Sequence, residues 1–344
     1  MPTGKSDNSC IIRFKKLQLR HNHGPDYGDY GATFSQNELS EERIQLATPT
    51  NAAGTRDGTA SKTKPLETIW IPLNVEKVNK LTNHKFGDQA YKDALLRPTK
   101  YIVVPSPDCR RMQIFVLVFT AANDFESRDT WRRIYGGRSM RRKFSYCVIF
   151  PIGRLENSND TARLLEESNL FDDILQGDYV DSYRNLPMKT LSALRFAAVA
   201  YPSLDSILKI DDDTAWNVPV VTRYMIRVLP KSISYVTYDE YKDDSYPQYC
   251  LGIAYVLHKT ALLPMLDAVP EMKYFWIDDV FVTGFMARAA NVSFVEINQF
   301  VERKPARKDF PDRIFYNDMM FYGTTKENIG RQFIDRTKYA LQFN

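Results

Sequence analysis

The chain has 344 residues, of which 44% are hydrophobic, and it carries a formal net charge of +4. This length allows one large domain or two ordinary ones, with a sizeable core. So small a charge argues against a nucleic-acid-binding protein, because such proteins usually concentrate basic residues on one face. The densest basic run, residues 132–143, is better explained as a solvated helix end and turn than as a polyanion site.

Neither a membrane span nor a cysteine framework is evident. The longest apolar run, residues 114–122, is far shorter than the ~20 residues that cross a bilayer. The N-terminus lacks the apolar core of a signal peptide, so the sequence by itself predicts a soluble, untargeted chain. The four cysteines form no CxxC pair, which disfavours structural zinc but leaves disulfides open. Sequons at Asn159 and Asn291 support a secretory route only slightly.

Composition divides the chain into three parts. Residues 1–65 are rich in Ser, Thr, Asn, Gly and Ala, which predicts a disordered or stem-like segment. Residues 66–108 give mixed signals and are expected to form a partly ordered lead-in. In residues 109–344, apolar runs alternate with helical patterns, which predicts an α/β domain with a largely parallel sheet. Neither GxGxxG nor a P-loop is present.

The elements of the third part can be placed from their periodicity. We expect strands, in chain order, at 112–120, 144–150, 206–210, 232–238, 253–258 and 292–297. We expect helices at 125–135, 159–170, 185–201, 218–229 and 278–290. Gly136 and Gly137 end the first helix, and Asn159 or Asp160 is the expected N-cap of the second.

Three adjacent aspartates, Asp211, Asp212 and Asp213, directly follow the expected strand at 206–210. In an α/β sheet, ligands bind at the carboxyl ends of strands. If the extended geometry continues, Asp211 and Asp213 point one way and Asp212 the other. Paired hard oxygens suit Mg²⁺ or Mn²⁺, which could neutralise a diphosphate leaving group. A helix cap within a solvated turn is the alternative.

A second acidic pair, Asp278 and Asp279, begins the expected helix at 278–290. Helix N-termini favour carboxylates, so capping alone could explain the pair. A carboxylate near the carboxyl edge of the same sheet could instead take a proton from an acceptor hydroxyl. Two acidic groups in one α/β domain together suggest metal-assisted group transfer.

Four sequence blocks point to a known family. They are RDTWRRIYG (128–136), FPIG (150–153), EESNLFDDILQGDYVDSYRNLPMKT (166–190) continuing into LKIDDD, and YPQYCLGIAYVL (246–257) followed by IDDVFVTG (277–284). In this order they resemble the β-1,3-galactosyltransferase/N-acetylglucosaminyltransferase family (glycosyltransferase family 31). The resemblance covers roughly residues 109–344. It implies a GT-A (Rossmann-like) fold and the use of UDP-sugars.

The resemblance also implies residue roles. Asp279, with Asp278 beside it, would be the catalytic base of an inverting, single-displacement transfer, and Asp213 would contact the metal with Asp211 close by. The implied donor-binding residues are Arg128, Arg132, Asp178, Asp181, Asn185, Lys189, Asp211 and Asp212. The implied acceptor-side residues are Tyr246, Tyr249 and Gly252. Structural alternatives stay open: Arg128 and Arg132 could be exposed helix charges, and Asp181 and Asn185 could cap the helix at 185–201.

The sequence departs from the family pattern at three places. The segment 320–333 has no histidine where the family supplies a late metal ligand; Tyr322 or Gly323 stands there, and the last histidine of the chain is His258. Such a loss should weaken metal affinity. Ile253-Ala254 replaces two family glycines. The family cysteine after the acidic pair falls at about Phe285, so Cys250 is expected to lack that disulfide partner.

The expected function is that of an inverting hexosyltransferase. It would move galactose or N-acetylhexosamine from a UDP-sugar to a hydroxyl of a glycan, glycoprotein or glycolipid, in a β-1,3 linkage. The expected cofactor is Mn²⁺ and the location the Golgi, with the family's membrane association although this chain shows no span; no nucleic-acid partner is expected. One alternative is a catalytically weak or inactive relative that binds a nucleotide-sugar or glycan. Another is an α/β domain whose acidic residues are only caps.

Overall fold

The computed structural model describes residues 10–14, 73–105, 109, 112–227, 247–250, 252–297, 300–302 and 320–326. Contacts divide the chain into one unit of Met1–Lys15 with Pro72–Asn344 and a second unit of Lys16–Ile71. Every described residue belongs to the first unit. Within the described ranges, no helix is both long enough and apolar enough to cross a bilayer.

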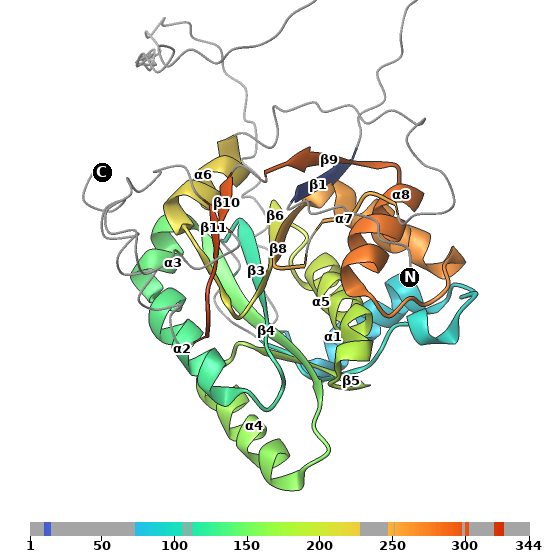
Figure 1. Cartoon of the computed structure of the whole chain (residues 1–344). Coiled ribbons are helices and arrows are strands. Elements are labelled where there is room, and N and C mark those ends of the chain that lie inside the picture. The colour runs from blue at the N-terminus through green and yellow to red at the C-terminus, as the bar shows by residue number, and fades with distance from the viewer. Residues whose placement is uncertain are drawn as a thin grey trace, which may run out of the picture. The chain divides into compact units, whose positions relative to one another are not determined.

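The described strands form one large and one small sheet (Figure 1). The large sheet has the order β2-β5-β4-β3-β6-β8-β1-β9, and the small one β10-β11-β7. The strands are β1 (Cys10–Phe14), β2 (Tyr101–Val103), β3 (Ile114–Phe119), β4 (Tyr146–Arg154), β5 (Ile174–Val180), β6 (Ser206–Asp211), β7 (Thr214–Trp216), β8 (Ala254–His258), β9 (Val292–Glu296), β10 (Val301–Glu302) and β11 (Phe321–Gly323). The strands β5, β4, β3 and β6 are mutually parallel, whereas β2, β8 and β9 each run antiparallel to a neighbour.

Helices lie on both faces of the large sheet (Figure 1). One face carries α5 with α1 and α7, and the other carries α2, α3 and α6. The α-helices are α1 (Val75–Thr82), α2 (Phe125–Tyr135), α3 (Arg138–Phe144), α4 (Ser158–Phe171), α5 (Leu186–Ala200), α6 (Val218–Arg227), α7 (Lys259–Ala268) and α8 (Ala287–Ala289). Shorter 3-10 or π-helical segments are η1 (Asn83–Gly87), η2 (Ala94–Leu96), η3 (Tyr183–Asn185), η6 (Val269–Glu271) and η7 (Asp279–Met286).

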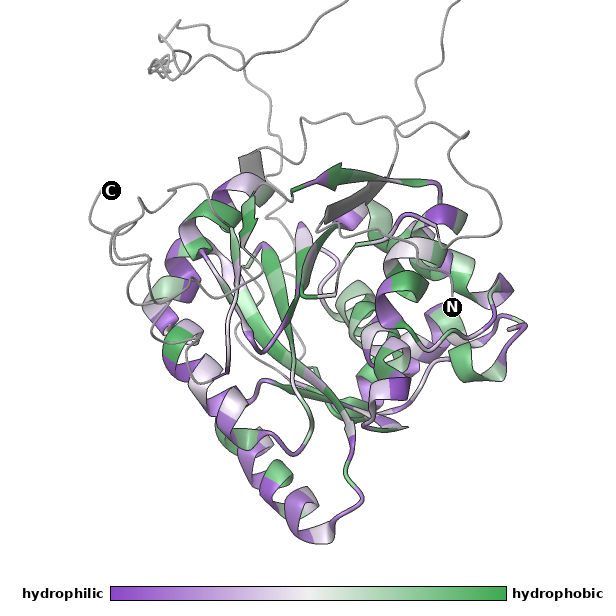
Figure 2. Cartoon of the chain, viewed as in Figure 1, coloured by the Kyte–Doolittle hydropathy of each residue, from purple (hydrophilic) through white to green (hydrophobic). Residues whose placement is uncertain are grey.

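Two hydrophobic cores follow from the alternation of strand side chains. Phe115, Leu117 and Phe119 of β3 belong to the core under α5, whereas Val116 and Val118 belong to the core under α2 and α6. The strands β3 and β4 are therefore apolar along almost their whole length, and they form the green centre of Figure 2. Burial of both faces explains why these runs do not alternate in polarity.

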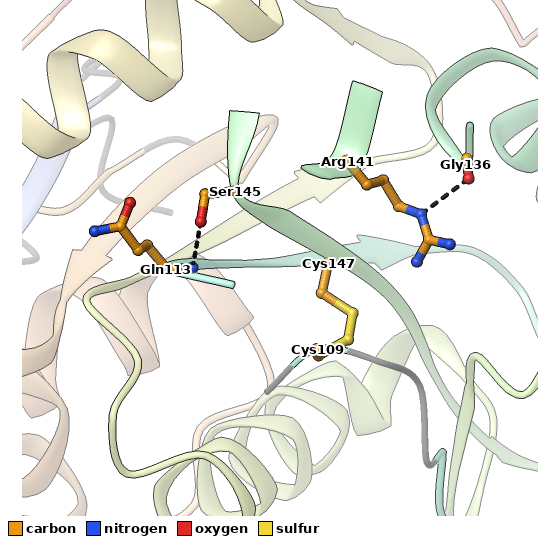
Figure 3. The surroundings of a disulfide bond; sticks show 6 residues. All are labelled: Cys109, Gln113, Gly136, Arg141, Ser145 and Cys147. Atoms are coloured by element: carbon orange, nitrogen blue, oxygen red, sulfur yellow. Dashed lines mark hydrogen bonds between the residues drawn. A yellow bond between two sulfur atoms is a disulfide. The ribbon is translucent and has the colours of Figure 1, made fainter. Parts of the chain in front are cut away.

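A disulfide joins the segment before β3 to β4. It links Cys109 and Cys147, which lies in the second position of β4 (Figure 3). Nearby, the backbone N–H of Gln113 donates to Ser145 Oγ at 3.2 Å. No described cysteine has a free thiol. Cys250 is disulfide-bonded as well, although Phe285 stands where the family has its partner cysteine.

The expectation of an α/β domain is confirmed, because helices cover both faces of a sheet whose central strands are parallel. The predicted strands at 112–120, 144–150, 206–210, 253–258 and 292–297 and the predicted helices at 125–135, 159–170 and 185–201 are all present within a few residues. The predicted strand at 232–238 lies outside the described residues. The N-cap expected at Asn159 or Asp160 is instead Asn157, whose side chain accepts the Asn159 N–H at 2.8 Å.

Two expected boundaries are wrong. Residues 10–14, expected to be disordered, form β1, which pairs in parallel with β8 and antiparallel with β9. The strand β2 and the helix α1, expected in a separate lead-in, belong to the large sheet and to the core under α5. Residue 109 is therefore not a domain boundary, because distant backbone pairing overrides local composition.

Candidate functional site

Polar side chains gather where the parallel strands end. Thr120 follows β3, Asp181 follows β5, and Asp211 ends β6. Because parallel strands end at the same edge of a sheet, these residues share one edge, the usual place for a ligand in an α/β fold. The acidic pair Asp278 and Asp279 reaches the same edge, because Thr190 near the start of α5 donates its hydroxyl to Asp278 Oδ1 at 2.8 Å.

A buried lysine lies among the carboxylates. Lys209, on β6, donates from Nζ to Asp211 Oδ1 at 2.6 Å and to the backbone carbonyl of Gly252. Burial alone would lower the pKa of Lys209, but Asp211, Asp279 and Asp278 together raise that pKa above its usual value. Lys209 therefore remains a cation and offsets part of the negative charge at this edge.

Two of the carboxyl groups around Lys209 hold their protons unusually strongly. Burial raises the pKa of Asp278 to about 7, against the lowering effect of Lys209, and Asp279 adds to the rise. Burial likewise raises the pKa of Asp211 to about 6, although Lys209 opposes it. Carboxyl groups with such values are found at sites that move protons near neutral pH.

Asp279 is the more accessible member of the acidic pair. It is half-buried, and its Oδ2 accepts the backbone N–H of Gly252 at 2.8 Å. Burial raises the pKa of Asp279, with Lys209 and the Gly252 N–H opposing the rise. The backbone around Asp279 is π-helical rather than the α-helix that we predicted, and such segments are common at functional sites. Asp279 can therefore reach an incoming hydroxyl, whereas Asp278 is covered.

The position of Asp279 leaves no room for a side chain at residue 252, so a glycine is needed there. A Cβ added at Gly252 would lie 2.2 Å from Asp279 Oδ1. We expect Gly252→Ala to displace the carboxylate and to lower the turnover number by about 10²-fold, since a shift of about 1 Å costs that much. Steady-state kinetics would measure this. Gly137→Ala is the matched control, because a Cβ there meets no atom within 4 Å. Equal turnover of the two variants would contradict the prediction.

The raised pKa of Asp278 predicts how stability depends on pH. A carboxyl that binds its proton more strongly when folded stabilises the fold at low pH and loses that contribution as the pH rises toward its folded pKa, here about 7. The free energy of unfolding of the wild type should thus fall more between pH 5 and 8 than that of Asp278→Asn, which keeps an oxygen for Thr190. Urea unfolding at both pH values would measure it. Asp267→Asn, an exposed change on α7, is the control and should behave as the wild type. If the free energy of unfolding of Asp278→Asn fell as much as that of the wild type, the pH dependence would not come from Asp278.

Arg128 and Arg132, implied as donor ligands, are held in an internal network. Arg128 is 0% exposed, and its donors go to both Glu167 oxygens, Thr120 Oγ1 and the carbonyls of Ala121 and Ala122. Arg132 bonds Glu167 Oε1 at 2.6 Å and both oxygens of Asp173. The structure thus gives both arginines a supporting role: Arg128 fixes the loop after β3, and Arg132 links α2 to α4 and to Asp173 before β5. They are not exposed helix charges.

The remaining implied donor residues lie at the same edge but differ in their contacts. The Lys189 ammonium donates to the Thr120 carbonyl at 3.0 Å and pairs with Asp181 at 3.0 Å. Asp181 Oδ2 also accepts the Gly153 N–H at 2.6 Å, so it does not cap α5. Two further side chains have local partners: Asn185 occupies the N-cap position of α5 without a side-chain capping bond and donates to the Val180 carbonyl, and Asp178 pairs with Arg154 at the surface.

Two of the three aspartates in the acidic triplet pair with different lysines. Asp211 pairs with Lys209, as described above. Asp212, which is buried, accepts Ser127 Oγ at 3.0 Å and pairs with Lys326 Nζ at 2.9 Å. Asp213 is exposed, and its side chain accepts only a long contact of 3.4 Å from Thr214 among the described residues. The prediction that Asp212 points away from Asp211 agrees with these separate partners.

Candidate metal ligands are few among the described residues. In the ranges that the structure covers, no three His, Cys, Asp or Glu side chains are grouped so that they could hold a metal. Asp211 and Asp212 are each paired with an ammonium, which leaves Asp213 as the exposed carboxylate of the triplet. The expected histidine position lies on β11, where Tyr322 is 4% exposed within the core under α2 and α6. Binding of Mn²⁺ by Asp213 and Asp211 was expected from the resemblance, and no contact between described residues tests it.

The implied acceptor side is held against the acidic pair. Thr283 Oγ1 accepts the Cys250 N–H at 2.8 Å and donates to the Asp279 carbonyl at 2.5 Å. Tyr249, which is partly buried, precedes Cys250, and Gly252 contacts Asp279 directly. Tyr246 lies outside the described residues. Cys250 and Gly252 therefore contact the segment that carries the candidate base, and the acceptor-side role of Tyr249 and Gly252 stays a prediction.

Sequence reasoning missed three residues of the site. Lys209 had a signal, because it is a charged residue inside the short, mostly apolar run that was expected to form a strand. Thr190 and Lys326 had none. Each reaches its partner across a long stretch of chain, and no local pattern specifies such a contact.

Comparison with known proteins identifies relatives of the chain. A family model described as Galactosyltransferase matches residues 126–298. The chain is 24% identical over 219 residues to human beta-1,3-galactosyltransferase 5, covering 58% of this chain and 70% of that protein. It is 25% identical over 280 residues to beta-1,3-galactosyltransferase bre-5 of Caenorhabditis elegans, covering 72% and 85%. A crystal structure of S. aureus TarS is similar at 11% identity and a TM-score of 0.34, over 65% of this chain and 38% of that one, which is too weak to bear on function.

Proposed function

The chain belongs to the Galactosyltransferase family, and we propose that it is an inverting hexosyltransferase that uses a UDP-sugar. The donated sugar would be galactose or an N-acetylhexosamine, and the acceptor a hydroxyl of a glycan, glycoprotein or glycolipid. Relatives named beta-1,3-galactosyltransferases support a β-1,3 linkage. The family also supports residence in the Golgi and a role in protein glycosylation.

One observation carries the proposal: Asp279 is the accessible carboxylate of a charged cluster at the carboxyl edge of the sheet. Its Oδ2 is held by the Gly252 N–H, and its pKa is raised by burial. A base works best when its pKa lies near the working pH and its position is fixed. Asp279 has a raised pKa and a fixed position, and Gly252 on the implied acceptor side lies against it.

The chemistry follows from this placement. The acceptor hydroxyl donates its proton to Asp279 while its oxygen attacks the anomeric carbon of the donor. The new C–O bond forms as the bond to the diphosphate breaks, and UDP leaves with the electron pair. Attack from the side opposite UDP inverts the anomeric carbon. Lys209 limits the cost of a second negative charge near Asp278 and Asp211, so that Asp279 is available as the base.

The test is a UDP-release assay on the full chain with UDP-galactose, UDP-N-acetylglucosamine, UDP-N-acetylgalactosamine and UDP-glucose. Each donor is offered with β-linked galactose, N-acetylglucosamine and N-acetylgalactosamine glycosides as acceptors. We expect acceptor-dependent release with a galactose or N-acetylhexosamine donor, and nuclear magnetic resonance of the product then gives linkage and anomeric configuration. A retained anomeric configuration would overturn the mechanism.

A second candidate function is a weak or inactive relative that binds the nucleotide-sugar or a glycan. It is favoured by the pairing of Asp211 and Asp212 with lysines, which leaves one exposed carboxylate in the triplet. It predicts saturable UDP binding by calorimetry with no acceptor-dependent release for any donor in the panel.

A further inference from the structure

A lysine from the C-terminal part of the chain reaches the acidic triplet. Lys326 Nζ lies 2.9 Å from Asp212 Oδ2 and 2.5 Å from Asp124 Oδ2. Asp124 is the N-cap of α2 and ends the short loop that follows β3, and Asp212 directly follows β6. The strands β3 and β6 are neighbours. The ammonium of Lys326 therefore bridges two adjacent strand ends at the edge where the donor is expected.

The backbone fixes Lys326 in this place. The strand β11 pairs antiparallel with β7, so that Gly323 lies opposite Thr214. The Thr324 N–H then donates to the Asp213 carbonyl at 2.9 Å. The segment that leads to Lys326 is thus held over the triplet by main-chain bonds, and its position does not depend on the salt bridges alone.

Lys326 also has capacity for a further contact. An ammonium has three N–H donors, and the two carboxylates account for two of them. The Lys326 side chain is 48% exposed, whereas Asp212 is only 10% exposed, so the cation is the accessible partner. Burial would lower the pKa of Lys326, but its bonds to Asp124 and Asp212 raise that pKa and keep the side chain charged.

The carboxylates around Lys326 require a positive charge before a diphosphate can bind there. Asp124, Asp212 and the exposed Asp213 are all acidic, and a diphosphate approaching them is repelled unless a cation lies between. A divalent ion could do this, but no group of three His, Cys, Asp or Glu side chains that could hold one is found among the described residues, and the sequence has no histidine after His258. Lys326 lies on the segment where such a ligand was expected, three or four residues past the position.

We propose that the Lys326 ammonium takes the place of a divalent cation and contacts the diphosphate of the nucleotide-sugar, so that donor binding is independent of metal. This rests on the proposed function, because it assumes a nucleotide diphosphate at this edge. The lysine is a binding residue for the donor, and it also offsets the charge that develops on the diphosphate as UDP leaves.

Calorimetric titration of the full chain with UDP, in EDTA and in Mn²⁺, tests the proposal. We expect the wild type to bind UDP with dissociation constants within about threefold of each other in the two buffers. Lys326→Gln should weaken binding by about tenfold or more in both, since a charge-assisted bond to phosphate is lost. Lys326→Arg should restore most of the affinity. Lys80→Gln, an exposed change on α1, is the control and should bind as the wild type.

Each other outcome is decisive. UDP binding by the wild type in Mn²⁺ but not in EDTA would overturn the metal independence and leave the proposed function standing. Unchanged affinity of Lys326→Gln would overturn the role of the lysine. No UDP binding by the wild type in either buffer would overturn the proposed function as well. Thermal unfolding of Lys326→Gln separates lost binding from lost folding, and its midpoint should stay close to that of the wild type because the side chain is half exposed.

Discussion

Asp279→Asn should lower the turnover number by about 10³-fold and leave the affinity for UDP within about threefold of the wild type. General base catalysis contributes about 10²–10⁴-fold, and an amide cannot take the proton of the acceptor. Asparagine has the same shape and keeps an oxygen for the Gly252 N–H, which now bonds Asp279 Oδ2 at 2.8 Å. Steady-state kinetics with the best donor and acceptor would measure the first effect, and calorimetry with UDP the second.

Two comparisons make the Asp279 result specific. Glu271→Gln removes an exposed carboxylate that pairs with Lys92, and it should leave both quantities unchanged. A loss of UDP affinity as large as the loss of rate would show that Asp279 supports donor binding. A turnover number close to that of the wild type would mean that another group accepts the proton.

Lys209→Met should lower the free energy of unfolding by about 3–5 kcal/mol at pH 8, because it leaves buried carboxylates without their counter-charge. The flexible thioether side chain can replace the aliphatic part of the lysine beside the Phe119 ring, 4.9 Å from the ammonium. The loss should be smaller at pH 5, where Asp278 and Asp211, with pKa values of about 7 and about 6, are largely protonated. Urea unfolding at both pH values would measure the difference.

The matched control for this variant is Lys259→Met. Lys259 pairs with Asp205 at the surface, where both side chains are well exposed, and such pairs contribute less than about 1 kcal/mol. If Lys209→Met lost no more stability than this control at pH 8, Lys209 would not stabilise the fold by neutralising the buried carboxylates around β6.

The sequence predicted features that depend on neighbouring residues. The apolar run before Asp211 correctly placed the triplet at a strand end, and Gly136 correctly ended α2. The N-cap of α4 is Asn157 and not Asn159. Both side chains can accept a helix N–H, so the residue type alone could not tell which of them caps the helix. The partners of Asp212 and Asp278 could not be predicted from the sequence. Lys326 contacts Asp212 and Thr190 contacts Asp278 only once the sheet has formed.

The place of β1 in the sheet affects how the protein folds while it is being synthesised. Residues 10–14 are made before both of their partners, since the parallel partner β8 begins at Ala254 and the antiparallel partner β9 at Val292. Synthesis of the roughly 240 residues between β1 and β8 takes about 12–50 s at ordinary translation rates. The sheet between β8 and β9 cannot close until most of the chain has emerged. Throughout that interval the nascent chain carries a strand without its partners, which makes it a natural client for chaperones that shield unpaired strand edges.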